Sequence, residues 1–141
     1  MQRAACYAEA DAFCFLSYTE GMPNAVLEAM AMGLPLVSSA AGGLRDILEH
    51  GVSGYLIHYD RCAETGHRFP AEEVADRIEE LAIDFEARFQ MADYNRTYAR
   101  ERFAAARVAA RLESIYHEML GQESPGGIKV KAGGNLEEPI K

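Results

Sequence analysis

Short apolar runs separated by turns and helical segments organise the first half of the chain. The run over residues 12–17 is almost unbroken and has the length of a strand. A strand without hydrophobic alternation is typical of a parallel sheet covered by helices, so we expect this strand to be buried on both faces. Similar runs over residues 34–39 and 55–57 predict a second and a third strand of the same sheet.

Helical patterns lie between and after these strands. The sequence predicts a short helix over residues 4–10, a helix from 24 or 25 to 32 that stops at Gly33, and another over about 44–50. Strand, loop, helix and strand in that order form a βαβ unit, whose crossover is almost always right-handed. Further helices are predicted over residues 71–83, 85–103 and 104–120.

The second half of the chain is more polar. Residues 58–70 look irregular, and we expect a solvated loop there, with a ligand cluster as the lesser alternative. We interpret the basic run in the last helices as a solvated face with ion pairs, and contact with a membrane as the alternative. The predicted apolar face of the helix over 71–83 is Val74, Ile78, Leu81 and Ala82, with acids opposite. The stripe predicted on the last helix is Leu112, Ile115, Tyr116 and Met119.

These elements predict an α/β fold with a partial Rossmann-like parallel sheet and C-terminal helices. We assign residues 1–121 to one partial domain and 122–141, which are rich in Gly, Pro, Lys and Glu, to a flexible tail. Three strands make a thin sheet, so we expect the chain to be the C-terminal portion of something larger. The unfinished edge of such a sheet leaves room for pairing with a second copy.

Composition and charge exclude several functions. The net charge of −8, from 22 acidic and 14 basic side chains, disfavours nucleic-acid binding because phosphate backbones are repelled. No apolar run is long enough to span a bilayer, and the N-terminus lacks the apolar core of a secretory signal, so we expect a cytoplasmic protein. The three cysteines and four histidines show no ligand-like spacing, so we expect no metal and no cofactor.

The segment with candidate chemistry follows the first strand. Glu20 lies in the loop that leaves the strand, and Glu28 lies about one turn into the next helix. Ligands of open α/β sheets bind outside the carboxyl ends of the strands, and the N–H groups of a helix start bind anions. Ionised carboxylates accept hydrogen bonds from sugar hydroxyls, so the pair suits a nucleotide sugar. The plain alternative is a solvated Glu20 and a Glu28 that merely favours the helix.

This segment, EGMPNAVLEAMAMGLPLVSSAAGG, carries an E-x7-E pair. It resembles the C-terminal nucleotide-sugar-binding domain of family 4 (group 1) glycosyltransferases of the GT-B fold. The resemblance continues through Gly42–Ile47 and Glu49–Leu56 and covers residues 4 to about 120. It implies that the chain is part of the C-terminal half of a GT-B enzyme, without the N-terminal acceptor-binding domain.

The resemblance also implies roles for single residues. Glu20, as the catalytic residue, would approach the hydroxyls of the transferred sugar, and Glu28 would bind the ribose. Gly42 and Gly43 would pack a tight turn beside the cleft, with direct ligand contact as the lesser alternative. Backbone donors to the diphosphate and the sugar would come from Gly21, Met22, Pro23, Asn24, Ala25 and Val26.

The function implied by the resemblance is retaining, metal-independent transfer of a sugar from a UDP-, GDP- or ADP-linked donor. The acceptor would be a glycan or a lipid-linked molecule, as in polysaccharide biosynthesis, which allows a place at the inner face of the membrane. The Arg and Lys that similar enzymes carry early in this domain have no counterpart before Glu20 except Arg3, which is misplaced. A non-catalytic nucleotide-binding or interaction module left by truncation is therefore the alternative. A sugar-nucleotide epimerase of similar fold fits the loop less well.

Overall fold

The computed structural model describes residues 3–62 and 66–121 of the 141-residue chain. The chain divides into two compact units, residues 1–101 and 102–141, and the first of them contains the parallel sheet. The tail predicted over 122–141 lies outside the described residues.

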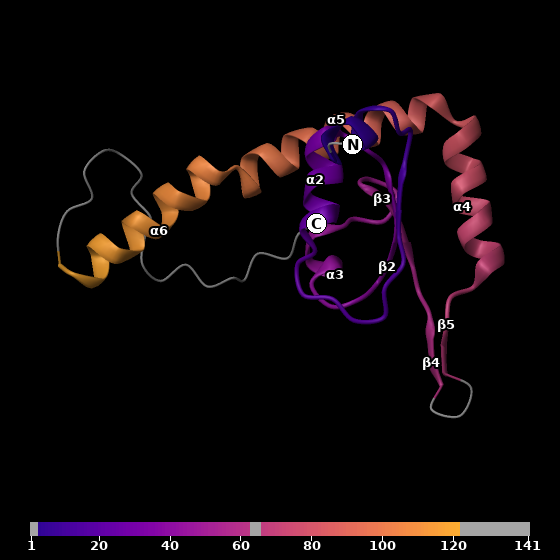
Figure 1. The fold of residues 1–141 in the computed structure, drawn as a ribbon, viewed down its shortest axis with the longest axis horizontal. Helices are drawn as coiled ribbons and strands as arrows, with labels where there is room; N and C mark the ends of the chain where they lie inside the picture. The colour runs from indigo at the N-terminus through magenta and orange to yellow at the C-terminus, as the bar shows by residue number, and fades with distance from the viewer. Residues whose placement is uncertain (1–2, 63–65, 122–141) are drawn as a thin grey trace. The chain divides into compact units, whose positions relative to one another are not determined.

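Three parallel strands form the sheet of the first unit (Figure 1). Their order is β1 (Phe13–Phe15), β2 (Leu36–Ser39) and β3 (Gly54–Ile57), with β2 in the middle. Phe13 lies opposite Leu36, so the two strands begin level with each other. The predicted α/β class with a partial parallel sheet is confirmed, and all three strands lie within the predicted runs to within one residue.

Three helices accompany the first two strands, namely α1 (Arg3–Ala8), α2 (Asn24–Met32) and α3 (Leu44–Ile47). Gly33 ends α2 as predicted, with a φ of 79° that L-residues with a side chain rarely adopt. Its N–H group donates to the carbonyl of Met30 over 2.8 Å. The helix α3 is shorter than the predicted 44–50, because the chain becomes extended at residue 48.

The remaining helices are α4 (Ala71–Ile83), α5 (Phe85–Phe103) and, in the second unit, α6 (Ala105–Met119). Their predicted bounds are confirmed to within one residue. Figure 1 shows α2 and α4 on opposite faces of the sheet. The interior strand β2 is fully buried between them. Its predicted burial on both faces is confirmed.

The predicted burial of β1 on both faces is wrong. Cys14 is exposed, and Phe13 and Phe15 are only half-buried. The physical reason is position: among the described residues β1 pairs with β2 alone and forms the edge of the sheet. The hydrophobic run therefore predicted a strand correctly, but it did not show whether the strand lies at the edge or in the interior of the sheet.

The predicted apolar face of α4 is also partly wrong. Leu81 is buried and Val74 packs against the core, but Ile78 is 44% exposed and Ala82 is exposed. The helix instead directs the carboxylate of Glu80 to the sheet, where it accepts a hydrogen bond from a strand side chain. Glu80 thus occupies a position of α4 that faces the sheet, so the buried side chains of this helix do not follow the predicted apolar face.

The segment predicted as an irregular loop over 58–70 contains an antiparallel hairpin. Its strands are β4 (Asp60–Cys62) and β5 (Gly66–Arg68), and the backbone of residue 60 pairs with that of residue 68. A two-stranded ribbon is held by backbone hydrogen bonds and does not need an apolar face, so the polar composition did not reveal it.

One cluster of the core of the first unit is formed by the sheet together with α4 and α5, and its buried side chains are Val37, Tyr55, Ile57, Leu81 and Met91. Val26 and Met30 of α2 are fully buried as well. A buried amide, that of Asn95, fixes α5 at the amino ends of the strands. Its Nδ2 donates to the carbonyls of Leu34 and Ser53, which precede β2 and β3, over 2.9 and 2.8 Å.

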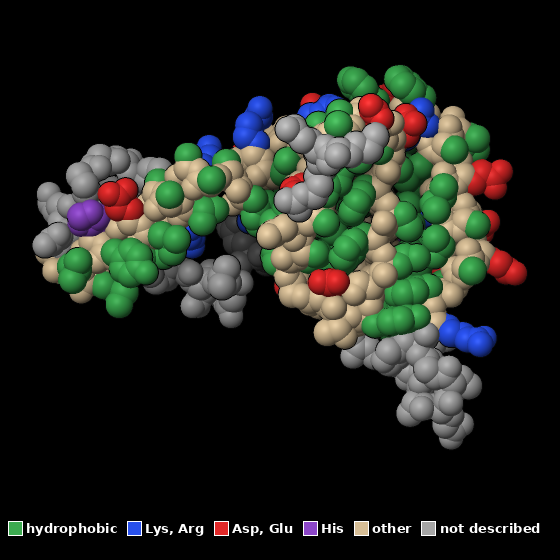
Figure 2. All heavy atoms as spheres, viewed as in Figure 1, with side chains coloured by type: hydrophobic (Ala, Val, Ile, Leu, Met, Phe, Trp, Pro, Cys, Tyr) green, Lys and Arg blue, Asp and Glu red, His purple; other side chains and the backbone are tan. Residues whose placement is uncertain are grey.

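The second unit presents α6 with much of its predicted apolar stripe at the surface (Figure 2). Leu112 is 50% exposed and Met119 is 77% exposed. The exposed side chains also include the arginines of the basic run, namely Arg96, Arg100, Arg102, Arg107 and Arg111. Their solvated face with ion pairs stays a prediction. None of the helices in the described part of the chain is both long and apolar enough to cross a membrane.

Candidate functional site

The candidate site lies at the carboxyl ends of the parallel strands. The loop over residues 16–23 follows β1 and enters α2, and the loop over residues 40–43 follows β2 and enters α3. Because the strands are parallel, these loops meet at one edge of the sheet, where open α/β folds bind ligands. The edge lies at the lower end of the sheet in Figure 1, beside α3.

Gly42 and Gly43 pack directly against the backbone of the loop that carries Glu20. A Cβ added at Gly42 would lie 1.8 Å from the carbonyl oxygen of Glu20, and Gly42 has a φ of +48°. A Cβ added at Gly43 would lie 2.5 Å from the carbonyl oxygen of Gly21. No side chain fits in either place, so both glycines are required by close approach of two backbones. The structure thus brings these four candidate residues together.

Gly21 differs from Gly42 and Gly43 in having space for a side chain. Its φ lies outside the positive range, and a Cβ built on it meets no atom of the described residues within 4 Å. The fold itself therefore does not require a glycine at this position. Open space beside an exposed backbone is what the close approach of a ligand would use.

The start of α2 supplies the candidate backbone donors. Pro23 is the N-cap and has no N–H group, and its carbonyl accepts from the N–H of Val26 over 3.1 Å. The side chain of Val26 is fully buried, whereas Met22 is 46% exposed. The prediction of a backbone donor at Pro23 is therefore wrong, because proline has no N–H group, and the N–H of Val26 already has an acceptor. The N–H groups of Asn24 and Ala25 lie in the first turn, where a helix offers no acceptor of its own.

Glu28 lies on α2 and faces α1. Its Oε2 accepts a hydrogen bond from the hydroxyl of Tyr7 over 3.0 Å. The same hydroxyl lies 3.5 Å from the carbonyl of Ala25. A pocket of about 440 Å³ adjoins the carboxylate, with Ala4, Ala31 and Met32 in its remaining wall. The sequence analysis missed Tyr7, whose place beside Glu28 depends on how α1 packs on α2.

Two more hydroxyl groups that the sequence analysis missed bind the loop of Glu20. Ser39, the last residue of β2, contacts both backbone groups of Ser17. The hydroxyl of Tyr59, which follows β3, donates to the carbonyl of Tyr18 over 2.6 Å. The pair of serines at the end of β2 was a weak signal for the first contact, and nothing in the sequence indicated the second.

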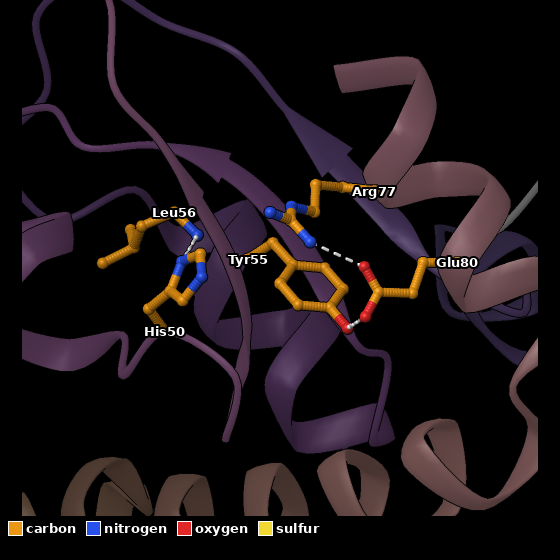
Figure 3. Close-up of polar contacts among 5 residues, drawn as sticks. All are labelled: His50, Tyr55, Leu56, Arg77 and Glu80. Carbon is orange, nitrogen blue, oxygen red and sulfur yellow. Dashed lines mark hydrogen bonds and ion pairs between the residues drawn. The ribbon is translucent and has the colours of Figure 1, made fainter. Parts of the chain in front are cut away.

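A polar cluster between β3 and α4 has the clearest electrostatic effects in the structure (Figure 3). The hydroxyl of Tyr55 donates to Oε1 of Glu80 over 2.6 Å, and Arg77 forms an ion pair with the other oxygen at 2.7 Å. Burial, and then the hydrogen bond to Glu80, raise the pKa of Tyr55 to about 12. The hydrogen bonds from Tyr55 and Arg77 lower the pKa of Glu80.

The cluster extends to one histidine. Nδ1 of His50 accepts from the backbone N–H of Leu56 over 3.1 Å, and its ring packs edge-on against Tyr55 (Figure 3). The contact of Tyr55 with Glu80 joins β3 to α4, and the contacts of His50 join the turn before β3 to this strand. We therefore interpret the cluster as a structural link between β3 and α4.

Within residues 3–62 and 66–121, no group of three or more His, Cys, Asp or Glu side chains is placed to hold a metal ion. Cys6 and Cys14 are free and exposed.

Known structures share this fold. Sucrose-phosphate synthase from Thermosynechococcus elongatus superposes with a TM-score of 0.68 at 23% identity, over 82% of this chain and 27% of that chain. HepE from Anabaena, in complex with UDP-glucose, superposes with a TM-score of 0.62 at 22% identity, over 80% of this chain and 29% of that chain. The C-terminal domain of the group 1 glycosyl transferase LpcC from Francisella tularensis superposes with a TM-score of 0.56 at 21% identity, over 72% of this chain and 47% of that chain. The predicted partial GT-B architecture is confirmed.

Sequence relatives agree with the fold. The chain is 34% identical over 113 residues to spore coat protein SA of Bacillus subtilis, covering 79% of this chain and 28% of the relative. It is 31% identical over 121 residues to N-acetyl-alpha-D-glucosaminyl L-malate synthase of Bacillus anthracis, covering 86% and 29%. The chain thus spans less than a third of the length of these relatives. A family model described as glycosyl transferases group 1 matches residues 1–84, so the chain belongs to the group 1 glycosyltransferases.

Proposed function

We propose that this chain is the donor-binding part of a retaining, metal-independent glycosyltransferase. It would hold a nucleotide sugar while the sugar passes to a glycan or lipid-linked acceptor bound by another part of the enzyme. The observation that carries the proposal is the position of Glu28, which faces a pocket of about 440 Å³ from a helix whose start lies at the carboxyl edge of the sheet.

The nucleotide end of the donor would lie along α2. The ribose hydroxyls would donate to Glu28, whose carboxylate is already oriented by Tyr7. The diphosphate would accept from the free N–H groups in the first turn of α2, where the helix dipole favours negative charge. This arrangement explains how a chain with a net charge of −8 would still bind an anionic ligand.

The sugar end would lie at the loop of Glu20. The half-buried Glu20 would accept hydrogen bonds from sugar hydroxyls, and the open side of Gly21 would admit the sugar or its phosphate close to the backbone. A relative of the same fold, HepE, has been solved with UDP-glucose, which supports a nucleotide sugar as the ligand class.

In the proposed reaction, the bond between the anomeric carbon and the diphosphate oxygen breaks. The oxygen of an acceptor hydroxyl forms the new bond on the same face of the sugar, its proton is released, and the nucleoside diphosphate leaves as an anion. Stabilising that departing charge with fixed dipoles is usually the largest contribution to catalysis in such sites. Neither glutamate acts as a nucleophile in this scheme, because each binds hydroxyl groups.

The experiment that tests the proposal is a thermal-shift panel on this chain with UDP, GDP, ADP, TDP and their common sugar conjugates. Preferential binding to the folded state raises the melting temperature, and the stabilisation grows with the logarithm of 1 plus the ratio of ligand concentration to Kd. We expect a shift selective for one base, larger for its sugar conjugate. A cooperative melt that no nucleotide shifts would overturn the proposal and favour the non-catalytic interaction module.

A further inference from the structure

The segment Ser17–Glu20 connects the end of β1 to the turn of Gly21. The backbone pairing between β1 and β2 stops at Phe15, which lies opposite Ser38. Beyond that point the segment has no backbone pairing with a strand of the described residues, yet it carries the residue proposed to bind the sugar. What holds the segment therefore determines where the carboxylate of Glu20 lies.

The first restraint is the hydroxyl of Ser39. This side chain is fully buried at the end of β2. Its Oγ accepts from the N–H of Ser17 over 2.9 Å and donates to the carbonyl of Ser17 over 2.6 Å. One hydroxyl thus satisfies both backbone groups of a loop residue and extends the pairing of the two strands by a side chain.

The second restraint is the hydroxyl of Tyr59, which donates to the carbonyl of Tyr18 over 2.6 Å. The two rings also pack edge-on, with centroids 5.4 Å apart. Phe69 stacks on Tyr18 at 4.5 Å and packs against the core of the first unit. Tyr18 is therefore held through both its backbone carbonyl and its ring by Tyr59 and Phe69, which follow β3 in the chain.

We propose that Ser39 and Tyr59 are positioning residues for the sugar end of the donor site. Their hydroxyls hold Ser17 and Tyr18, and the contact of Gly42 with the Glu20 carbonyl fixes the next part of the loop. Glu28 does not depend on these restraints, since it lies on α2 and is oriented by Tyr7. The inference rests on the proposed function, because it assumes that Glu20 binds the sugar.

The test compares Ser39→Ala and Tyr59→Phe with two matched controls. Ser38→Ala removes a neighbouring buried hydroxyl whose contact, 3.5 Å to the carbonyl of Ser39, is weak. Tyr55→Phe removes a hydroxyl hydrogen bond of 2.6 Å on the α4 side of the sheet. Binding of UDP and of UDP-glucose is measured by calorimetry for each variant.

We expect the test variants to bind UDP-glucose about fivefold or more weakly while their affinity for UDP stays unchanged, because Ser39→Ala removes two hydrogen bonds that fix the loop and Tyr59→Phe removes one. Amide hydrogen exchange at residues 17–20 should also accelerate in these two variants. The controls should change neither the affinity ratio nor the exchange. A general loss of folding would lower both affinities together, so the ratio separates positioning from stability.

The outcomes distinguish this inference from the proposed function. Wild-type protein that binds neither ligand would overturn the proposed function for UDP donors. Wild-type binding of both ligands, with the same affinity ratio in Ser39→Ala and Tyr59→Phe, would overturn the positioning role alone. Equal weakening of UDP and UDP-glucose would do the same, since it would show a structural effect that is not confined to the sugar end.

Discussion

The hydroxyl of Tyr7, on α1, donates a hydrogen bond to Oε2 of Glu28, on α2, over 3.0 Å. The contact joins two helices that are separated by the whole of β1 and the loop of Glu20. It holds one oxygen of a carboxylate that lines the pocket between the two helices. Tyr7, which lies outside the E-x7-E motif, thus orients a group that the motif supplies.

Tyr7→Phe should weaken nucleotide binding by about 0.5–1.5 kcal/mol, the net value of one hydrogen bond, because the carboxylate of Glu28 loses its orientation. Tyr116→Phe, at an exposed position on α6, is the control and should change nothing. Calorimetry with the best nucleotide measures both. The double variant Tyr7→Phe/Glu28→Ala should bind no worse than Glu28→Ala alone, and additive losses would contradict the coupling.

Glu28→Ala and Glu20→Ala should have different effects on binding. Loss of Glu28 leaves ribose hydroxyls unpaired and should cost about 1–3 kcal/mol for both the bare nucleotide and the nucleotide sugar. Loss of Glu20 should weaken the nucleotide sugar and leave the bare nucleotide unchanged. Glu79→Ala, on the exposed side of α4, is the matched control. Equal effects of both changes on a bare nucleoside diphosphate would refute the division of roles.

Gly21→Ala should separate binding from stability. The added methyl group meets no described atom, so the free energy of unfolding should stay the same or rise by up to about 1 kcal/mol through the unfolded chain. Binding of the nucleotide sugar should nevertheless fall. Gly42→Ala should instead lose more than about 1 kcal/mol of stability, because its Cβ would collide with the Glu20 carbonyl. Urea unfolding and calorimetry measure the two effects, and unchanged binding by Gly21→Ala would show that no ligand approaches there.

Asn95→Ala should destabilise the fold by about 2–4 kcal/mol. The change leaves the buried carbonyls of Leu34 and Ser53 without their donor. Asn95→Asp should be worse, since it places a carboxylate beside two acceptors. Gln90→Ala, at an exposed position on the same helix, is the control for urea unfolding. A loss by Asn95→Ala no larger than that of the control would mean that the amide does not hold α5.

The pKa of Tyr55 predicts a loss of stability at alkaline pH. The folded state keeps this phenol protonated up to a pKa of about 12, whereas the unfolded chain ionises it near the ordinary value of about 10. The stabilisation is therefore complete below pH 10 and disappears as the pH rises through 12. Chemical unfolding across this range should show a shallower decline in Tyr55→Phe than in the wild type. Parallel curves would exclude Tyr55 as the source.

The sequence predicted the elements well where local patterns determine them. The bounds of α4 follow from its helical period between Pro70 and Asp84, and the end of α2 follows from Gly33. These features depend on the preferences of a few neighbouring residues.

Features that depend on distant partners were not predicted. The exposure of Cys14 follows from the edge position of β1, and the hairpin of β4 and β5 is held by backbone pairing that polar side chains do not reveal. The contacts of Tyr7 and Tyr59 join residues 21 and 41 positions apart. No local pattern encodes them, because they require the packed arrangement of several elements.

The interlocked carboxyl-edge loops have a consequence for exchanging parts between related enzymes. The segment after β1 takes its shape from a serine at the end of β2, a glycine in the next turn and a tyrosine after β3. A chimera that receives only residues 17–24 from another enzyme would lose these partners and misplace its own glutamate. An exchange of the loop that is meant to alter donor preference should therefore also transfer residues 39–43 and 59, because these residues hold the loop in place.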